Sequence, residues 1–535
     1  MLMQIRCDKF AEEFRTINFY PGLNTVLGSV NGSNALGKST FLWVIDFVFG
    51  GEGYCAPGSD IKTEIKDHTI AFTFRFDGIS HYFYRSTATP KSVARCDKDG
   101  HLIKNLSLDE FRRFLGEQYH PNIAFSEIPD RFFRIYGKEN TYEKYPYLTK
   151  PRESDDKAAD FLIRLFGKGS VLAALQTAEE ELGVKEAQWI KAKRQPKSFE
   201  KIEENEESIS SLKNRLSQLM GSENNIGLGY LGLGSQTFEN VSRLQKELRS
   251  LMKRRRQLEL KRDSIQNGNH DFIEMPLADD FDELAAFFPG VNIRDLMQIE
   301  SFHRQLHVIL ENEINEELAR LDPMIAACDR EIDRISQRLA GSGIADDLTR
   351  RVLSQCVSIS KQIDQLELEN QELSREKELQ AQRILAERRL EDLINDRIAA
   401  TEEVVNAINA KLVALNLAVT NGKENAPVLE ITRNKTISFG TKGNTSEGTA
   451  FKSMVLFDLA ILSLTNVPAL IHDGNILHSI SEEQFEEILR LYRDAGKQIF
   501  IAVNKAENDL LTDSVVLKLS EGHELYGYSW SRKHV

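Results

Sequence analysis

The chain has 535 residues, more than a single hydrophobic core usually serves, so two or more structural units are expected. Hydrophobic residues make up 41% and charged residues 28%, and a charged share above the usual quarter indicates long solvated helices. With 68 Lys and Arg against 81 Asp and Glu, the net charge of −13 would repel nucleic acid, so DNA contact requires a local basic stripe.

Hydropathy and cysteine usage exclude several classes of protein. The apolar stretch 454–464 is interrupted by Asp458 and is too short to span a bilayer, so no membrane-embedded protein is expected. Residues 1–10 alternate apolar and polar side chains, which predicts a strand rather than a signal peptide, and a cytoplasmic location. The five cysteines include no CxxC pair, which argues against a disulfide framework and a structural zinc site.

The first part of the chain, 1–154, is rich in predicted strands. Alternating runs at 69–76 and 80–85 are joined by Asp77-Gly78, a dipeptide typical of a hairpin turn. We therefore expect a folded α/β or α+β lobe here.

From about residue 155 the composition changes to Glu, Lys, Arg, Gln and Leu. Apolar residues follow three- and four-residue steps at 202–219, 241–258 and 394–415, and each such seam covers one narrow face. A coiled coil or long hairpin over 155–416 would bury these seams, whereas a solvated single helix is the alternative. Glycine- or proline-containing breaks at 221–237, 267–292 and 341–345 all fit the tip of the hairpin, and the sequence leaves that choice open.

Strands and helices alternate again in the last part, 417–535. Strands are predicted at 428–432, 435–439, 468–472 and 498–503, and helices at 447–464 and 482–495. A globular start, a long helical insertion and a globular end predict one α/β head formed from both chain ends.

The strongest motif is a phosphate-binding loop. Residues 32–39 match G-x-x-x-x-G-K-S in full, between an apolar strand at 23–27 and an apolar helix at 40–49. Glycines let backbone N–H groups approach phosphate, and a helix N-terminus favours negative charge. The residues expected to bind ATP are Gly32, Asn34, Gly37, Lys38, Ser39 and Thr40.

Catalysis at such a loop needs Mg²⁺ and a carboxylate. Lys38 would reach the β- and γ-phosphates, and the Ser39 hydroxyl would bind Mg²⁺. Asp473 ends an apolar strand and is the Walker B candidate, although Asp473-Gly474 is also a turn dipeptide. Many such ATPases have Glu after this Asp to polarise water. Because Gly474 stands here, either hydrolysis is slow or another residue orients the water.

Residues 504–507, N-K-A-E, resemble the guanine-reading N-K-x-D of GTPases. The last residue is Glu and no DxxG begins at Asp473, so ATP is favoured over GTP. Asn504 follows the strand after Asp473, where ABC-type ATPases place a residue that senses the γ-phosphate. A strand-end polar cap is the alternative.

The order of these motifs resembles that of the SMC-like and RecF-like ABC ATPases. The segment 21–28, the phosphate loop, the helical hairpin and the Walker B strand carry the resemblance. It implies a homodimer in which two heads sandwich ATP, and a signature motif of each head contacts the other head's nucleotide. Residues 443–449 stand where that signature belongs, so Ser446 and Gly448 would contact phosphate, although G-N-T-S-E-G-T departs from L-S-G-G-Q. A helix cap at Ser446 is compatible with this role.

More narrowly, the segments 34–39, 288–291, 299–310 and 471–474 look like those of short bacterial SMC-like ATPases. Relatives of this kind belong to three-component, Lamassu-like systems of defence against phages and plasmids. The resemblance implies a small partner subunit and an effector such as a nuclease. The missing CxxC at the hairpin argues against a zinc-hook dimer.

Two basic runs, 191–197 and 253–262, are candidates to contact double-stranded DNA. Each neutralised phosphate would add salt-dependent affinity without sequence readout. A solvated helix face is the alternative, because Glu-rich neighbours dilute the field.

Two functions follow from these residues. In the first, the chain is an ATP hydrolase that couples head closure to DNA sensing or to control of a partner effector. In the second, it is a nucleotide-clamped, weakly hydrolysing scaffold for a partner nuclease. A transporter ATPase subunit is disfavoured because such chains lack so long a helical insertion.

Overall fold

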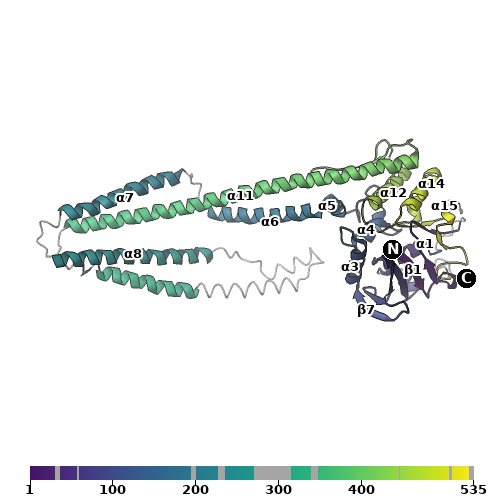
Figure 1. The fold of residues 1–535 in the computed structure, drawn as a ribbon, viewed down its shortest axis with the longest axis horizontal. Helices are drawn as coiled ribbons and strands as arrows, with labels where there is room; N and C mark the ends of the chain where they lie inside the picture. The colour runs from purple at the N-terminus through teal and green to yellow at the C-terminus, as the bar shows by residue number, and fades with distance from the viewer. Residues whose placement is uncertain are drawn as a thin grey trace. The chain divides into compact units, whose positions relative to one another are not determined.

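The computed structural model describes residues 1–29, 36–56, 60–193, 200–226, 235–269, 315–335, 337–338, 347–444, 446–504 and 509–528 (Figure 1). The chain divides into two compact units. We call the unit Met1–Trp189 with Gln380–Val535 the head unit, and the unit Ile190–Leu379 the arm unit.

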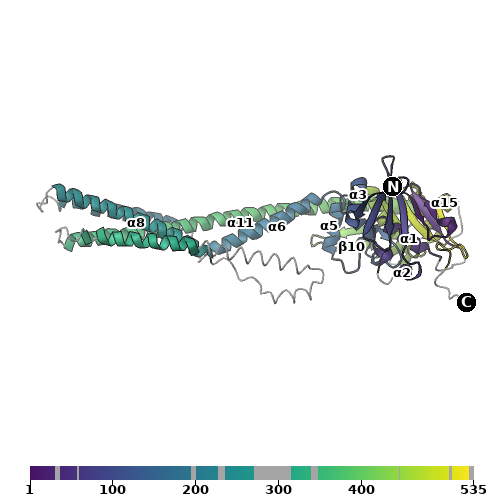
Figure 2. The same ribbon diagram turned by 90° about the horizontal axis from the view of Figure 1, so that it is seen from below.

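One sheet of the head unit is antiparallel, with the strand order β2-β1-β4-β5-β6-β7. Figure 2 shows purple to blue strands of the head unit side by side. Asp77 (φ 47°) and Gly78 (φ 81°) join β4 to β5. Both have left-handed backbone, as a two-residue type I′ hairpin turn requires. The predicted hairpin is therefore confirmed. The strands are β1 (Leu2–Cys7), β2 (Thr16–Asn18), β4 (Thr69–Phe76), β5 (Ile79–Ser86), β6 (Ser92–Cys96) and β7 (Leu102–Ser107).

The second sheet is parallel throughout, with the order β13-β3-β12-β11-β8. β3 and β8 come from the first part of the chain, and the other three strands come from its last part. Every residue of β11 and β12 is buried, as expected for parallel strands that are covered on both faces. The strands are β3 (Leu23–Leu27), β8 (Phe133–Arg134), β11 (Ala469–His472), β12 (Gln498–Val503) and β13 (Val515–Lys518).

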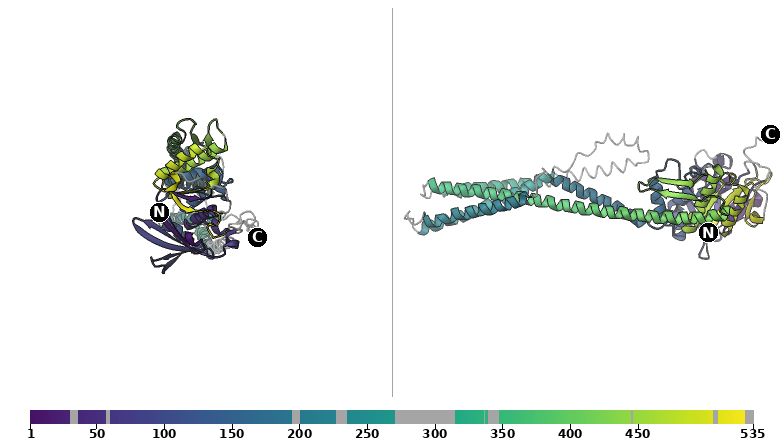
Figure 3. Two further views of the ribbon diagram at one scale, coloured as in Figure 1. Left: turned by 90° about the vertical axis from the view of Figure 1, so that its right-hand side faces the viewer. Right: turned by 90° about the horizontal axis from the view of Figure 1, so that it is seen from above.

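Helices pack on this parallel sheet and separate its core from solvent. The N-terminal strands and the C-terminal helices occupy different layers of the head unit (Figure 3). β9 (Pro427–Ile431) and β10 (Ile437–Thr441) form a separate hairpin, so the elements predicted after residue 416 nearly coincide with those observed. The helices are α1 (Lys38–Val48), α2 (Asp60–Glu64), α3 (Leu108–Tyr119), α4 (Glu127–Phe132), α5 (Asp155–Leu165), α12 (Glu447–Leu464), α13 (Gly474–Leu477), α14 (Glu482–Asp494) and α15 (Asp509–Thr512).

Long helices make up the insertion between the two parts of the head unit. α11 has 74 residues and is roughly 110 Å long at about 1.5 Å per residue. In the arm unit, Ile209 of α7 packs against Ile359 and Ile363 of α11, so this residue of the seam predicted at 202–219 is buried against another helix. The helices are α6 (Gly169–Ala192), α7 (Lys201–Ile226), α8 (Ser235–Asn269), a helix over 315–335, and α11 (Asp347–Thr420).

The tip of the hairpin stays a prediction. α7 ends at Ile226 and α8 begins at Ser235, and α8 itself continues to Asn269. The other residues of the candidate breaks 221–237 and 267–292, and all of 341–345, lie outside the described residues. Among the helices described, none combines the length and the apolar character needed to cross a membrane.

Candidate nucleotide-binding site

The N-terminus of α1 carries no side-chain cap. Gly37 stands at the N-cap position with φ 97°, and the first turn contains no acidic residue. Among the described residues, no side chain therefore accepts a hydrogen bond at this end of the helix, where the helix dipole is positive. Ser39 and Thr40 lie in this turn and are partly buried. Gly32 and Asn34 of the predicted loop lie outside the described residues.

Gly28, Lys38 and Asn504 meet where β3 and β12 end. A Cβ atom on Gly28 would lie 2.3 Å from Asn504 Oδ1 and 2.9 Å from Lys38 Nζ. A side chain at position 28 would displace one or both of these groups, so Gly28 allows the lysine and the asparagine to approach each other. The fold thus brings together two residues that were predicted from motifs far apart in the sequence.

The side-chain oxygen of Asn504 is buried and has no hydrogen-bond partner among the described residues. An unsatisfied buried acceptor costs about 1–3 kcal/mol, so it is usually found where a ligand or water completes it. A strand-end cap, the alternative role of this residue, would bond the oxygen to the chain, and the described residues contain no such bond.

Asp473 directly follows β11 and is 3% exposed. Its Oδ1 accepts a hydrogen bond from the Gly474 N–H at 2.7 Å, and its Oδ2 accepts one from the Tyr136 N–H at 3.0 Å. Burial lowers the pKa of Lys38 below its ordinary value, and the nearby Asp473 carboxylate partly offsets this effect. Asp473 also caps the short helix α13, so it occupies the turn position that its sequence allows, and its role toward a metal stays a prediction.

The C-terminal segment packs against the end of the predicted phosphate loop, which the sequence did not indicate. The Leu525 N–H donates to the Leu36 carbonyl oxygen at 3.2 Å. A Cβ atom on Gly37 would lie 2.8 Å from Leu525 Cβ, so glycine is required here for packing as well as for its backbone conformation.

A buried polar network behind Asp473 was also missed. Arg134 of β8 donates to both carboxylate oxygens of Asp458 on α12, from Nε at 2.5 Å and from Nη2 at 2.6 Å. His472 bonds to Asp458 Oδ2 at 2.9 Å and to the Tyr492 hydroxyl at 2.5 Å. All four side chains are fully buried. Since the Arg134 carbonyl oxygen accepts from the Asp473 N–H at 3.0 Å, the network supports the strand end that presents Asp473.

Ser446 and Gly448 lie at the start of α12. Ser446 occupies the N-cap position, but its hydroxyl donates to Thr449 Oγ1 at 2.9 Å and bonds to no backbone N–H. A Cβ atom on Gly448 would lie 2.4 Å from the Ser479 carbonyl oxygen, so packing after α13 requires glycine here.

The basic run 253–262 is largely paired within the arm unit. Four of its cations lie in ion pairs with acidic residues of neighbouring helices, and Lys253 and Arg254 are exposed. Arg194 and Lys197 of the other basic run lie outside the described residues. The pairs are Arg255–Asp329, Arg256–Asp364, Lys261–Glu317 and Arg262–Asp322.

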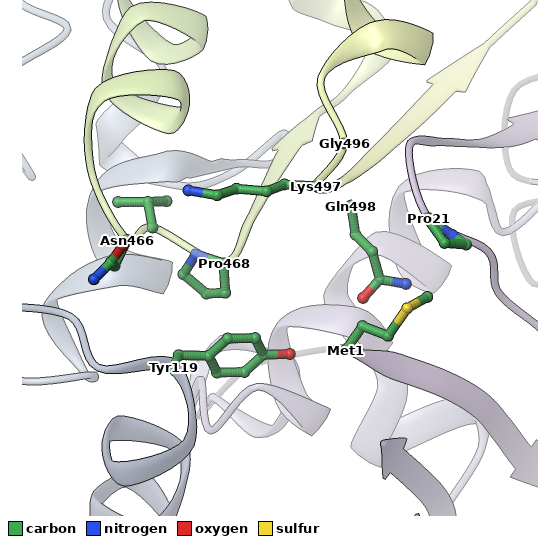
Figure 4. Close-up of a pocket in the computed structure, with 9 residues that line it drawn as sticks. Met1, Pro21, Tyr119, Asn466, Pro468, Gly496, Lys497 and Gln498 are labelled. Atoms are coloured by element: carbon green, nitrogen blue, oxygen red, sulfur yellow. The ribbon is translucent and has the colours of Figure 1, made fainter. Parts of the chain in front are cut away.

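The hollow in Figure 4, of about 190 Å³, lies at the other edge of the parallel sheet. Pro468 and Gln498 line it where β11 and β12 begin, whereas Asp473 and Asn504 stand where these strands end. Lys497 Nζ donates there to the carbonyl oxygens of Leu462 and Thr465, which end α12. This hollow is therefore separate from the candidate site.

Comparisons with known proteins extend this description. A family model described as an uncharacterised protein conserved in bacteria (DUF2326) matches residues 404–527, a range that includes Asp473 and Asn504. No curated protein matches the chain.

Among solved structures, the chain is similar to an Smc head domain with a coiled coil and joint from Pyrococcus yayanosii. The identity is 15% and the TM-score 0.46, over 97% of this chain and 94% of that one. An Smc head domain with an extended coiled coil bound to the C-terminal domain of ScpA, from Pyrococcus furiosus, has 10% identity and a TM-score of 0.40, over 97% and 92%. Because these TM-scores lie below 0.5, we argue the function from the site itself.

Proposed function

We propose that the head unit binds ATP with Mg²⁺ at the N-terminus of α1 and hydrolyses it. The observation that carries the proposal is the approach of Lys38 to both Asn504 and Asp473 beside an uncapped helix N-terminus. These residues follow the carboxyl ends of adjacent parallel strands, β3, β12 and β11. Open parallel sheets bind ligands at this edge.

The donor set suits a nucleoside triphosphate with its metal. Lys38 brings a cation to the phosphates, and the glycine cap leaves first-turn N–H groups of α1 for phosphate oxygens. The Ser39 hydroxyl and the Asp473 carboxylate are oxygen donors of the kind that Mg²⁺ prefers, and we assign them as its ligands. Mg²⁺ bound there would neutralise charge that develops on the phosphates. Gly32, Asn34 and Thr40 complete the loop in this proposal.

Asn504 would distinguish ATP from ADP. Its buried oxygen lacks a partner among the described residues, and it lies next to the Lys38 side chain across Gly28. A hydrogen bond from a γ-phosphate-bound water would satisfy this oxygen, and the bond would be lost with the γ-phosphate. The side chain would therefore report the state of the nucleotide.

We further propose that the chain works as an SMC-like or RecF-like ABC ATPase. Two copies would close through their heads, with Ser446 and Gly448 of one copy against the ATP of the other. Ser446 is exposed at the start of α12, which supports a contact outside its own head. Head closure would respond to double-stranded DNA or control a small partner subunit and an effector in cytoplasmic defence. These partners rest on the motif order and on the resemblance in sequence.

A second function is favoured by Gly474. A Cβ atom on this residue would lie 2.9 Å from the Ala502 carbonyl oxygen, so a glutamate cannot be placed there without a shift of the backbone. A chain without a substitute for that glutamate would bind ATP and hydrolyse it slowly. It would then serve as a nucleotide-clamped scaffold for a partner nuclease.

The test is equilibrium binding of MgATP together with steady-state hydrolysis, with and without linear double-stranded DNA. Lys38→Ala should lose binding. Lys98→Ala should retain it, because Lys98 is an exposed lysine between β6 and β7, far from the loop in the sequence. Binding without turnover would favour the scaffold. A wild-type chain that binds no ATP, or a Lys38→Ala variant that binds it normally, would contradict both functions.

A further inference from the structure

His478 lies one helical turn after Gly474, at the end of α13. Its N–H donates to the Gly474 carbonyl oxygen at 2.9 Å. A Cβ atom on Gly474 would lie 3.3 Å from His478 Nε2 and 3.6 Å from its Cδ2. Side chains of a helix lean toward its N-terminus, and the imidazole accordingly folds back over Gly474, toward the end of α13 that Asp473 caps.

The imidazole thus occupies space that a side chain at position 474 would otherwise enter. Two observations explain the glycine: the Ala502 carbonyl oxygen on one side and the His478 ring on the other would both meet a Cβ atom. The glutamate expected after Asp473 is absent, and a titratable group from four residues further along stands beside its position.

We propose that His478 orients and deprotonates the water that attacks ATP. This inference rests on the proposed ATPase function and names a further catalytic residue for it. The water oxygen forms a bond to the γ-phosphorus, and the bond from that phosphorus to the β–γ bridging oxygen breaks with its electron pair leaving on ADP. The proton of the water passes to His478 Nε2, in the tautomer that carries its own proton on Nδ1, and then to solvent.

The surroundings of His478 suit this role. The residue is exposed, and its ring makes no hydrogen bond to any residue in the described part of the chain, so Nε2 can accept a bond from water. Asp473 is less suited to act as the base, since each of its oxygens already accepts a backbone N–H and it is assigned to the metal. Asp458 is held by Arg134 and His472 in the core.

The experiment compares His478→Ala and His478→Gln with Asn475→Ala, a matched change of an exposed residue on the same short helix. A positioned acid or base contributes about 10²-fold or more to rate, so kcat should fall by about that factor in His478→Ala. The affinity for MgATP should stay at the wild-type level in all three variants. His478→Gln, which can hold a water but cannot take its proton, should also turn over slowly.

A second readout is the nucleotide that remains bound after incubation with ATP and rapid gel filtration. The histidine variants should retain ATP, whereas the wild type and Asn475→Ala should have converted it to ADP. Wild-type turnover in His478→Ala, loss of MgATP affinity in that variant, or a wild type that binds ATP without hydrolysing it would each overturn the proposal. If instead the wild type binds no ATP, the proposed function itself fails, and the binding measurement separates the two failures.

Discussion

Removal of the Asp458 carboxylate should destabilise the head unit strongly. This carboxylate accepts two hydrogen bonds from Arg134, at 2.5 and 2.6 Å, and one from His472 at 2.9 Å, and all three residues are fully buried. In Asp458→Ala the guanidinium would keep only its bonds to backbone oxygens of Asn140 and Pro146. Because one partner of a buried ion pair is left uncompensated, the free energy of unfolding should fall by about 3–5 kcal/mol.

That loss is a large part of the total, since domains are stable by only about 5–15 kcal/mol. Urea unfolding followed by tryptophan fluorescence would measure it, because Trp43 lies on α1 in the head unit. Glu483→Ala is the matched control: it breaks an exposed pair with Lys423 at 3.3 Å, and such pairs contribute about 0–1 kcal/mol.

A double variant makes this prediction sharper. Replacing both charges, as in Arg134→Met with Asp458→Leu, removes the unpaired buried cation, so part of the stability lost in Asp458→Ala should return. An unfolding free energy of Asp458→Ala that matches that of Glu483→Ala would refute the reasoning. A double variant whose loss of stability relative to the wild type equals the sum of the losses in Arg134→Met and Asp458→Leu would refute it as well.

Three further predictions concern the site and the arm unit. Asp473→Ala should abolish Mg²⁺-dependent turnover, and unchanged ATPase activity would remove Asp473 from the site. Gly28→Ala should weaken MgATP binding because its methyl group would lie 2.3 Å from Asn504 Oδ1, whereas Gly440→Ala, with no atom within 4 Å of its Cβ, should bind normally. Replacement of Lys253 and Arg254 by Ala should weaken DNA binding at low salt. The slope of log K against log salt concentration should become shallower by about 2, because each phosphate contact contributes about 0.9 to it. An unchanged slope would exclude this stripe as a DNA contact.

Local patterns predicted most elements of the head unit. β11, β12, α12 and α14 begin and end close to the expected residues, because each is a compact run with one period and clear boundaries. Lys38, Asp473 and Asn504 were also predicted from local motifs. Their approach to one another depends on the order of strands in the parallel sheet. The motifs suggest this order, and the pairing of β12 with both β3 and β11 establishes it.

The residues that were missed share a different property: each acts through a partner on another element. Asp458 looked like an interruption in an apolar helix, yet it is the acceptor for Arg134, 324 positions earlier in the chain. Leu525 contacts Gly37 of the predicted phosphate loop through packing that no local pattern encodes.

Gly474 shows how an absent residue can itself be informative. In the sequence it marks only a missing glutamate, and slow hydrolysis or a substitute group explain it equally well. In the structure, the Ala502 carbonyl oxygen and the His478 ring flank the position so closely that glycine is required. The Ala502 carbonyl oxygen is enough to explain the glycine, so the glycine fits both loss and substitution of the glutamate. The His478 ring beside this position is the observation that favours substitution, and the turnover of His478→Ala decides between them.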